Sequence, residues 1–497
     1  MTSNTLRAVS LRRVLPATSF VGCADVATDH ATDHHAKCRP GSLFVAIRGT
    51  QHDGSQYVSQ AVQSGAAAVL VDEPQIGLNV PQCVVPNVRV AYSQLCLALA
   101  GRPDRTLDIT GVTGTNGKTT VTWLLRSIFE TAERKCGLVG TVEFHDGANA
   151  RAASQTTPGP SEFSSLLETM VRNGAKNACV EISSHALDQK RLAGLRLASA
   201  IVTNVTQDHF DYHGDQTGYL SAKEKIADYC SYNTPLVVNR DDEGCRQLMK
   251  RWSRRRVVAF GLQSDADARA QILEANADRT NVRFDLFGEQ FDCDIRLPGQ
   301  YNVSNCLAAA TAAHLAGVET EAIAAGLSHV VFVPGRLQPI DYGQQFRVFV
   351  DYAHTPDGLT NVLSALRPIT SGRLCCVFGA GGDRDRTKRP LLGEASSAAD
   401  LAIVTSDNPR SENPVSIIND ICQGLSEPPA HVEPDRATAI RWAIQQAEPG
   451  DCIVITGRGH EAWQQIGDAR LPLDDRSIAA EAIAHRMSRV ADRAKAV

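Results

Sequence analysis

A short loop rich in glycine and threonine, with a lysine near its end, is the part of the sequence best suited to chemistry. Residues 113–120 read TGTNGKTT, with an apolar run at 107–112 before them and a helical pattern after them. Glycines allow backbone N–H groups to surround phosphate oxygens, and the N-terminus of the following helix adds further donors. We therefore expect Lys118 to contact the β- and γ-phosphates of a nucleotide, and Thr119 to ligate Mg²⁺.

The loop departs from the strict phosphate-loop pattern at one position. That pattern requires glycine five residues before Gly117, where this chain has Val112. We favour a variant phosphate loop, because an expected strand precedes the segment and an expected helix follows it. The alternative is a turn rich in glycine and threonine that only begins a helix.

Acidic and histidine side chains follow two further expected strands. Glu181 comes directly after the apolar run 178–180, and residues 203–214, which read TNVTQDHFDYHG, follow the run 200–202. The carboxyl ends of parallel strands border the ligand crevice of such sheets, so we expect these side chains near the loop. Their chemistry suits a hard metal and phosphate, and the cysteines of a structural zinc site are missing. A solvated glutamate at a strand end and structural histidines are the alternatives.

Lys223, on the next expected helix, has a less obvious role. A protonated amine near a magnesium ion would repel it, so this side chain contributes to such a site only if its charge is removed. A depressed pKa or conversion to a carbamate would remove that charge. By its spacing alone, Lys223 is an ordinary surface lysine.

The elements that would hold these residues alternate between strands and helices, which indicates an α/β protein. From about residue 106 the pattern predicts a mainly parallel sheet with helices on both faces, and residues 281–297 predict antiparallel strands at its edge. A second, Rossmann-like α/β series follows residues 333–336, and the first hundred residues form another unit that ends at the linker 101–103. The domains expected are 1–103, 104–335 and 336–497.

Length and composition are those of an enzyme with several domains. The chain of 497 residues exceeds one ordinary core, and a net charge of -5 with a pI near 6.3 argues against a general nucleic-acid binder. No apolar stretch reaches the ~20 residues of a membrane span, and no apolar region of a signal peptide is present. Fourteen cysteines without a CxxC pair are typical of reduced thiols. We expect a cytoplasmic monomer that neither binds nucleic acid nor spans a membrane.

Together with the loop, seven further segments resemble those of the Mur ligase family, in the family's order. They are EISSHALDQKRL at 181–192, TNVTQDHFDYHG at 203–214, PGQYNVSNCLAA at 298–309, VPGRLQ at 333–338, VDYAHTP at 350–356, GGDRDRTKRP at 381–390 and DNPR at 407–410. The resemblance implies three domains that hold a uridine diphosphate substrate, ATP and an amino acid in turn. It also implies a Mg²⁺- and ATP-dependent ligase of peptidoglycan synthesis, and hence of cell shape and division, that activates a carboxylate as an acyl phosphate.

The resemblance assigns roles to individual positions. ATP-binding positions of the family match Gly114, Thr115, Asn116, Gly117, Lys118, Thr119, Thr120, Asn302, Asn305, Arg336 and Asp351. Positions that hold the UDP-muramoyl-dipeptide match Thr50, Gln51, His52, Thr156, Thr157, Ser183, Gln189 and Arg191. The catalytic residues implied are Lys118, Glu181, His209 and Lys223. The metal ligands implied are Thr119, Glu181, His209 and Lys223 as a carbamate.

Within the family, the segment DNPR at 407–410 carries the strongest signal for the amine substrate. A guanidinium presents a planar fork that matches a carboxylate, so Arg410 favours an amino acid with a second carboxylate over lysine. Arg384 could contact another carboxylate, and Glu461 a distal ammonium. We therefore expect meso-2,6-diaminopimelate to be joined to UDP-N-acetylmuramoyl-L-alanyl-D-glutamate. The residues expected to bind it are Arg384, Asp407, Asn408, Pro409, Arg410, Gly457 and Glu461.

Other functions stay open at this point. The same ligation could use L-lysine, the chain could be a ligase of the folylpolyglutamate synthase type, or it could be a non-catalytic ATP-binding scaffold. The segments DNPR and TTPGP at 156–160 argue against the second alternative. The joint presence of the four implied catalytic residues argues against the third.

The N-terminal domain departs from the family's pattern. Residues 33–41 read DHHAKCRPG where relatives usually show an Asp-Ser-Arg stretch, so we assign no uridine contact there. The loop 49–54 does match the family, which keeps residues 50–52 as candidates. A metal site formed by the nearby histidines and cysteine is an interpretation that we weigh and do not favour; those residues are His30, His34, His35 and Cys38.

Overall fold

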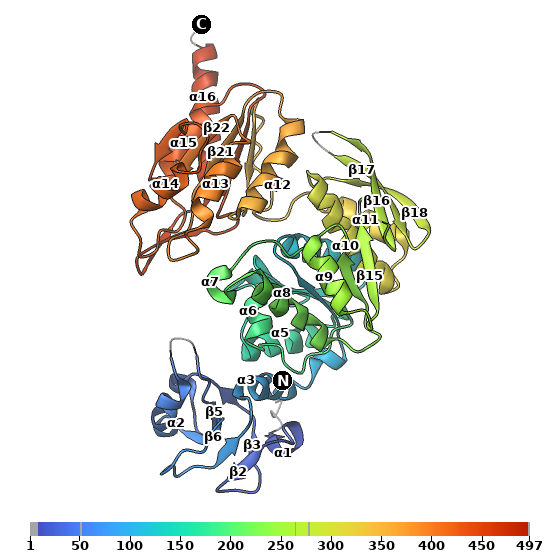
Figure 1. The fold of residues 1–497 in the computed structure, drawn as a ribbon, viewed down its shortest axis with the longest axis vertical. Coiled ribbons are helices and arrows are strands. Elements are labelled where there is room, and N and C mark those ends of the chain that lie inside the picture. Colours follow the sequence, from blue (N-terminus) through green and yellow to red (C-terminus); the bar gives the residue numbers. More distant parts are fainter. Residues whose placement is uncertain (1–7, 50–51, 264, 277–278, 496–497) are drawn as a thin grey trace.

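The computed structural model describes residues 8–49, 52–263, 265–276 and 279–495. Three domains follow one another along the long axis of the molecule, with the N-terminal domain at one end and the C-terminal domain at the other (Figure 1). Each domain is built on a β-sheet of its own with helices packed on it. The α/β class and the three-domain plan are confirmed, whereas the exact boundaries at residues 103 and 335 stay predictions.

The N-terminal domain contains the first seven strands and three helices. The strands are β1 (Val9–Ser10), β2 (Ser19–Val21), β3 (Ala27–Thr28), β4 (Ala31–Thr32), β5 (Ser42–Val45), β6 (Ala66–Val71) and β7 (Gln82–Val84), and the helices are α1 (Leu11–Val14), α2 (Val58–Gln63) and α3 (Val88–Leu99). The main sheet has the order β2-β7-β6-β5-β4, and only β2 runs antiparallel to its neighbour. α3 joins this domain to the next, since the Ser93 hydroxyl donates to the Lys190 carbonyl at 2.9 Å.

The central domain is built on a sheet of eleven strands. They are β8 (Asp108–Thr113), β9 (Cys136–Val139), β10 (Glu143–His145), β11 (Ala150–Ala152), β12 (Asn177–Glu181), β13 (Ser199–Val202), β14 (Leu236–Asn239), β15 (Val257–Gly261), β16 (Ala268–Ala275), β17 (Thr280–Leu286) and β18 (Glu289–Ile295). The order is β11-β10-β9-β12-β8-β13-β14-β15-β16-β17-β18, parallel from β9 to β16 and antiparallel at both ends. The antiparallel edge expected at 281–297 is therefore confirmed, and β16 extends it.

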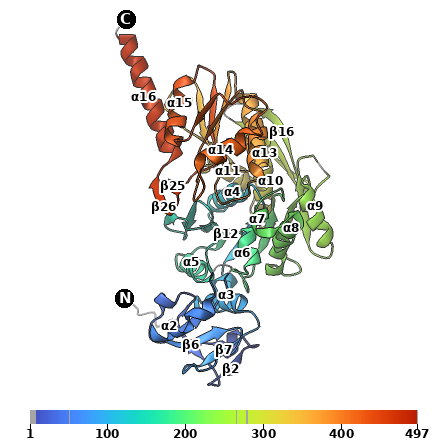
Figure 2. The ribbon, with the colours of Figure 1, turned by 60° about the vertical axis from the view of Figure 1, so that its left-hand side comes forward.

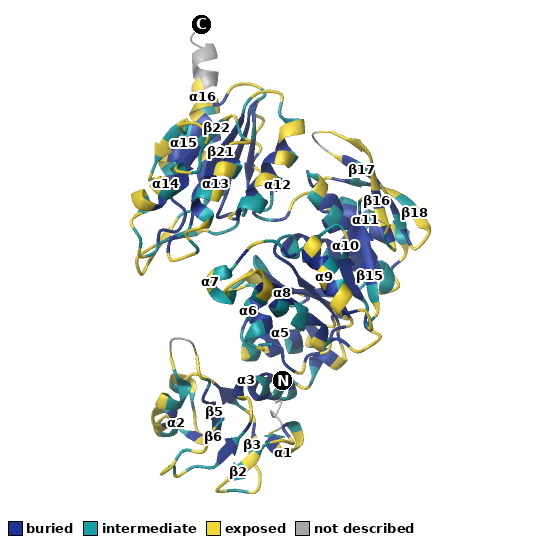
Figure 3. Ribbon diagram, viewed as in Figure 1, coloured by how far each residue is buried: buried dark blue, intermediate teal, exposed yellow. Residues whose placement is uncertain are grey.

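Helices cover both faces of this sheet. They are α4 (Lys118–Thr131), α5 (Pro160–Arg172), α6 (Ser184–Asp188), α7 (Phe210–His213), α8 (Gln216–Glu224), α9 (Glu243–Arg251), α10 (Gln300–Leu315) and α11 (Thr320–His329). One hydrophobic core holds α4, α10 and α11, and a second, on the other face, holds α5, α6, α8 and α9. The strands between them are buried on both sides, which explains their continuous apolar runs (Figure 3).

The C-terminal domain has a six-stranded sheet and a separate hairpin. Its strands are β19 (Gln338–Pro339), β20 (Arg347–Val350), β21 (Leu374–Phe378), β22 (Leu401–Thr405), β23 (His431–Glu433) and β24 (Cys452–Ile455), with β25 (Trp463–Ile466) and β26 (Ala469–Pro472) in the hairpin. Its helices are α12 (Pro356–Leu366), α13 (Lys388–Ser396), α14 (Pro414–Cys422), α15 (Arg436–Gln446) and α16 (Asp475–Lys495). The sheet order is β19-β20-β24-β21-β22-β23, and only β19 is antiparallel. α12, α13 and α14 pack on one face and α15 and α16 on the other.

Two observations bear on the expected environment of the protein. Among the described residues, no helix combines the length and the apolar character that crossing a membrane requires. All fourteen cysteines are free thiols, and most are buried. Burial raises the pKa of the Cys83 thiol to about 12, which keeps it protonated and unreactive.

Candidate active site

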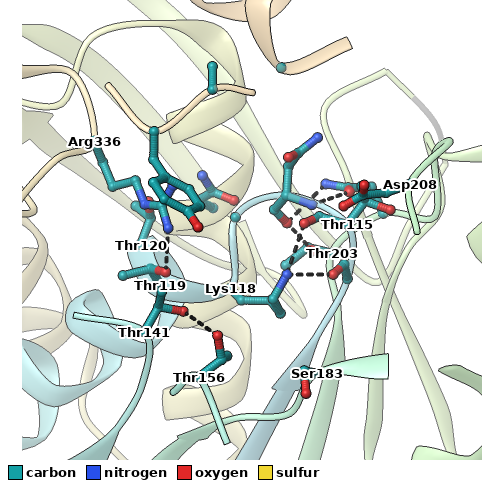
Figure 4. Close-up of a pocket in the computed structure, with 18 of the residues that line it drawn as sticks. Thr115, Lys118, Thr119, Thr120, Thr141, Thr156, Ser183, Thr203, Asp208 and Arg336 are labelled. Carbon is teal, nitrogen blue, oxygen red and sulfur yellow. Dashed lines mark hydrogen bonds between the residues drawn. The ribbon is translucent and has the colours of Figure 1, made fainter. Parts of the chain in front are cut away.

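A cavity of about 460 Å³ lies where the phosphate loop, α10 and the segment after β20 meet. Its walls come from the central and the C-terminal domain, and Figure 4 shows Arg336 beside Thr119 and Thr120. Of the residues that the sequence singles out, the cavity is lined by Gly114, Thr115, Asn116, Gly117, Lys118, Thr119, Thr120, Thr156, Thr157, Ser183, Arg191, His209, Lys223, Asn302, Asn305, Arg336 and Asp351. Most positions assigned to ATP, dipeptide and metal therefore share one cavity, although their individual roles stay predictions.

The Lys118 side chain folds back onto the backbone of the phosphate loop. The Lys118 ammonium donates to the carbonyls of Gly114 at 2.8 Å and Thr115 at 2.9 Å (Figure 4). Burial lowers the pKa of this lysine, and the carboxylates of Glu181 and Asp208 oppose that shift. A half-buried cation that forms no ion pair with any described residue is a natural partner for a phosphate.

The structure around two positions explains how the loop sequence differs from the strict phosphate-loop pattern. Val112 lies inside β8, where it is fully buried and pairs with Glu181 and Ile201 of the neighbouring strands. The loop therefore begins after Val112, and a glycine at that position would only remove a side chain from the core. Gly117, with φ 86°, ends the loop at α4, and a Cβ atom there would overlap the Asn305 side chain.

Glu181 is the last residue of β12 and is fully buried. Its carboxylate accepts hydrogen bonds from the Thr119 hydroxyl at 3.1 Å, and from the Thr141 hydroxyl and N–H at 2.8 Å each. Arg336 also donates to the Thr119 hydroxyl, at 3.0 Å. No lysine, arginine or histidine of the described residues forms an ion pair with Glu181, so this buried charge has oxygen neighbours but no cation.

Lys223 is buried on α8, in contrast to the surface lysine that its spacing suggests. Burial and the nearby charge of Lys118 hold its pKa well below the usual range. Its ammonium lies 4.4 Å from the centre of the Tyr219 ring, and no ion pair holds it within the part of the chain that the structure describes. The neighbouring Asp208 pairs instead with Lys388 of the C-terminal domain, with 2.5 Å between the two atoms.

His209 stands beside these groups at the start of α7. Its imidazole lies 3.3 Å from the Asp208 carboxylate and packs edge-on against His185. Burial lowers the pKa of His209 to about 3, although Asp208 opposes the shift. The ring is therefore neutral near pH 7, which leaves a nitrogen lone pair for a metal.

Most of the residues assigned to the dipeptide are divided between this cavity and a second one. Thr157 and Ser183 hydrogen-bond each other, and Arg191 donates to the Thr157 carbonyl at 2.8 Å. Gln189 lines a second cavity of about 230 Å³ between the N-terminal and central domains, together with Arg191. His52 lines neither cavity. Thr50 and Gln51 fall outside the described residues.

The residues assigned to diaminopimelate form a separate cluster in the C-terminal domain, outside the two cavities. Asn408 donates to the Glu461 carboxylate at 3.0 Å, and the Arg410 guanidinium donates to the Gly382 carbonyl at 2.5 Å. Asp407 sits so close to Gly457 that a Cβ atom there would lie 2.5 Å from its carboxylate. Pro409 closes the turn by contact with the backbone of Gly382.

The charges of this cluster are unbalanced in a way that suits a zwitterionic ligand. Burial raises the pKa of Glu461, and the Asp407 carboxylate raises it further. Burial also lowers the pKa of Arg410, and Arg384 adds to this effect. Arg384 reaches toward the central domain, where its guanidinium is 4.0 Å from the Asp211 carboxylate. Two arginines and two carboxylates thus face one another with few neutralising contacts, which favours binding of both an anion and a cation.

Several contacts that the sequence did not predict complete the site. Asp208 belongs to the segment expected near the loop, but its ion pair with Lys388, which joins two domains, was not expected. Asp357 accepts from the Asn116 amide at 2.9 Å and the Thr206 hydroxyl at 3.3 Å, again across domains. Thr141 contacts Glu181 and lies in no motif. Asp208 and Asp357 lie in or beside quoted motifs, but only the fold shows what they contact.

Comparison with known proteins decides the family. Models of the Mur ligase middle domain match residues 112–313, of the glutamate ligase domain 335–459, and of the Mur ligase family catalytic domain 36–101. The chain is 41% identical over 459 residues to "UDP-N-acetylmuramoyl-L-alanyl-D-glutamate--2,6-diaminopimelate ligase" of Gloeobacter violaceus, covering 91% of this chain and 93% of that one. The protein of the same name from Solibacter usitatus is 39% identical, covering 89% and 91%. The chain belongs to the Mur ligase family.

Solved structures of Mur ligases share the fold. A structure of a UDP-N-acetylmuramoyl-L-alanyl-D-glutamate--2,6-diaminopimelate ligase is 29% identical, with a TM-score of 0.68 over 97% of this chain and 99% of that one. MurF of Acinetobacter baumannii is 17% identical, with a TM-score of 0.64 over 96% and 97%. A folylpolyglutamate synthase of Mycobacterium tuberculosis has a TM-score of 0.58 but covers only 74% of this chain and 92% of its own. The three-domain plan is therefore that of Mur ligases, and folylpolyglutamate synthase shares a smaller part of it.

Proposed function

We propose that this protein joins meso-2,6-diaminopimelate to UDP-N-acetylmuramoyl-L-alanyl-D-glutamate in an ATP-dependent reaction that passes through an acyl phosphate. The reaction would supply peptidoglycan synthesis, and we expect it to occur in the cytoplasm with the protein as a monomer. The name shared by relatives that are 38% to 41% identical over about nine tenths of the chain is the observation that carries this proposal. The unbalanced charges around Arg410 and Glu461 support it independently.

The cavity supplies what phosphoryl transfer to a carboxylate needs. The γ-carboxylate of the D-glutamyl residue attacks the γ-phosphorus of ATP, the bond to the bridging oxygen breaks, and ADP leaves. Lys118, half-buried at the start of α4, offsets the negative charge on the transferred phosphoryl group. Arg336, 3.0 Å from the Thr119 hydroxyl, brings a second cation to the same place.

The residues around Glu181 fit a divalent cation. A fully buried carboxylate that has a hydroxyl neighbour and lacks an ion pair among the described residues offers hard oxygen ligands, as Mg²⁺ requires. Thr119 and Glu181 would hold such an ion, with His209 and a carbamate on Lys223 as further ligands. When bound, Mg²⁺ would withdraw charge from the phosphate oxygens.

Lys223 has the properties that carbamate formation needs. Its depressed pKa favours the uncharged amine, whose nitrogen lone pair can attack the carbon of CO₂. A C–N bond forms, one C–O π bond becomes a carboxylate, and the amine loses a proton. The product is an anion where the unmodified side chain would be a cation, so it can face a metal.

The second half-reaction needs the C-terminal domain. The amine of diaminopimelate attacks the acyl-phosphate carbonyl, and phosphate leaves from the tetrahedral intermediate. In this scheme Arg410 contacts the distal carboxylate and Glu461 the distal ammonium, with Asn408 between them. Contacts such as Asp208 with Lys388 hold the domain against the cavity, which limits access of water to the acyl phosphate.

Product formation tests the proposal directly. Purified protein, ATP, Mg²⁺ and UDP-N-acetylmuramoyl-L-alanyl-D-glutamate are incubated with meso-diaminopimelate or with L-lysine, and the products are separated by mass. We expect a product with diaminopimelate and little with lysine. Equal rates with both amino acids would refute the proposed substrate, and no product with either would refute the ligation itself.

A further inference from the structure

Arg458, in the loop after β24, is a fully buried cation behind the cluster of Asp407, Asn408 and Glu461. It lines neither of the two cavities, so it does not contact a ligand there. One terminal nitrogen donates to the side-chain oxygen of Asn408 at 3.1 Å, and the other to the Leu473 carbonyl at 2.9 Å and to the Trp463 carbonyl. Its Nε atom is 3.8 Å from the Asp475 carboxylate.

The contacts of Asn408 fix which way its amide faces. Its Oδ1 accepts from the Arg458 guanidinium at 3.1 Å and from the Gln465 N–H at 2.8 Å. A guanidinium and a backbone N–H can only donate, so the oxygen must face them and the amide nitrogen must face away. The nitrogen then points to Glu461 and donates to its carboxylate at 3.0 Å.

The orientation of this amide decides what the amino-acid cluster offers to a ligand. When the amide nitrogen of Asn408 points to Glu461, Asn408 and Arg410 both present hydrogen-bond donors to a ligand. The hydrogen bond from Asn408 also holds the Glu461 carboxylate in place as an acceptor for a cation. A flipped amide would place its oxygen beside the Glu461 carboxylate, where two acceptors repel each other, and the carboxylate would lose its fixed position. The hydrogen bond from charged Arg458 is stronger than the one from the neutral Gln465 N–H, so Arg458 contributes most to the orientation.

We propose that Arg458 is a positioning residue for the amine substrate. It acts through the Asn408 amide, and so sets the preference for an amino acid that carries both an ammonium and a carboxylate on its distal carbon. This inference rests on the proposed function, because it assumes that the cluster binds diaminopimelate.

Arg436 provides a matched control. It is as deeply buried as Arg458 and also contacts Asp475, at 2.9 and 2.8 Å, but it donates to the carbonyls of Ser406 and Thr456 and does not touch Asn408. Replacing Arg436 therefore disturbs the same buried charge network without releasing the amide.

A double-mutant cycle tests whether Arg458 acts through Asn408. KM and kcat are measured with diaminopimelate, L-lysine and ATP for Arg458→Met, Asn408→Ala and the double variant. Arg458→Met should raise the KM for diaminopimelate by roughly 10- to 100-fold, leave the KM for ATP unchanged and reduce the preference over lysine. The double variant should be no worse than Asn408→Ala alone, and Arg458→Lys should restore part of the loss.

The opposite results would overturn the inference. Additive effects of the two substitutions, an equal rise in the KM for ATP, or the same KM profile in Arg436→Lys would each make Arg458 a purely structural residue. If Arg458→Met does not fold, the cycle is run with Arg458→Lys, where a smaller KM increase with the same non-additivity is expected and additivity refutes the inference. Wild-type protein assayed in parallel separates the two claims, because its failure to use diaminopimelate would refute the proposed function instead.

Discussion

Lys223 shows how burial changes the chemistry of a single amine. The side chain lies inside the central domain with a pKa well below the usual range, beside the cavity that holds Lys118. Two lysines in one cavity would repel both each other and a metal if both stayed protonated. Conversion of one to an anion removes that conflict.

If the carbamate is used, Lys223→Ala should be almost inactive, and a small carboxylic acid such as acetate should partly restore activity. The reason is that the acid can occupy the space of the missing carbamate and supply its negative charge. Rates are measured with and without added acid, with Lys250→Ala on the exposed side of α9 as the control. Near-normal activity of Lys223→Ala would remove the residue from the mechanism.

In the proposed function, the choice of amine depends on Arg410. Arg410→Ala should lower kcat/KM for diaminopimelate by roughly 100-fold or more, because the distal carboxylate would lose its charged partner. The KM for ATP should not change, since the cluster lies outside the ATP cavity. Steady-state kinetics with each substrate varied in turn measures both. An equal loss in KM for ATP would show that Arg410 supports the fold and does not select the amine.

The sequence indicates which residues could belong to the site, but not how deeply they are buried or what they contact. The phosphate loop and Glu181 could be found because each follows an expected parallel strand, and the carboxyl ends of such strands border one crevice. Lys223 could not be found as a buried residue, because its burial depends on how α8 packs against the phosphate loop and its neighbours. Arg458, next to Gly457, could not be singled out, because the sequence does not show whether an arginine is buried or exposed.

At the level of elements, a glycine allows the third domain to approach the second. Gly335, just before Arg336, has φ 66°, and a Cβ atom there would overlap the backbone of Gly459 and His460. This contact brings the loop after β24 against the connection between domains. Only glycine fits both the backbone angle and the space.

Gly335→Ala should therefore reduce kcat strongly, because the C-terminal domain can no longer seat against the central one. Gly343→Ala is the matched control: Gly343 has φ 83°, but no atom lies within 4 Å of the added Cβ. Both variants lose about 1 kcal/mol of stability because alanine is unfavourable at a positive φ. Only Gly335→Ala also places a Cβ atom where it overlaps the backbone of another segment. Kinetics and thermal unfolding of both variants measure this difference; equal effects of the two would contradict the explanation.

Asp451, just before β24, forms an ion pair with Arg373, just before the neighbouring strand β21. Burial alone would raise the pKa of its carboxyl, but hydrogen bonds from Arg373 and from the backbone of Glu448 hold the pKa below its usual value. The Arg373 guanidinium is 2.7 Å away. A carboxyl with a depressed folded-state pKa stabilises the fold above its unfolded pKa of about 3.9, and this contribution is lost as pH falls through the folded value.

Asp451→Asn should therefore lower the free energy of unfolding at pH 7 by about 1–3 kcal/mol, and by less near pH 3. Denaturant unfolding across pH measures the difference, with exposed Asp468→Asn as the control. A loss that is the same at both pH values would show that the carboxylate charge does not matter.

The order of strands and helices in the central domain could be read from the sequence because each buried strand forms an apolar run and each helix follows a turn. β9 (Cys136–Val139) and β15 (Val257–Gly261) were not predicted, although they are as long as β13 and β12, which were. The boundary of β8 also differs from the expected one, because Thr113 continues the strand to the loop.

On the scale of the whole molecule, the site depends on contacts between domains. Asp208 with Lys388 and Asn116 with Asp357 join residues 180 and 241 positions apart in the chain. Figure 2 shows the C-terminal domain next to the central domain, with α16 projecting away from both. The order of the motifs could predict three domains, but not how the C-terminal domain sits against the central one. That arrangement depends on a few contacts between residues far apart in the chain.

The amino-acid dependence of phosphate release tests the central claim most directly. Purified protein is given ATP and Mg²⁺, with UDP-N-acetylmuramoyl-L-alanyl-D-glutamate and each candidate amino acid added singly and together, and released phosphate is followed over time. We predict rapid release only when the nucleotide dipeptide and meso-diaminopimelate are both present. Release that is equally fast with L-lysine, or that needs neither the dipeptide nor an amine, would contradict the account.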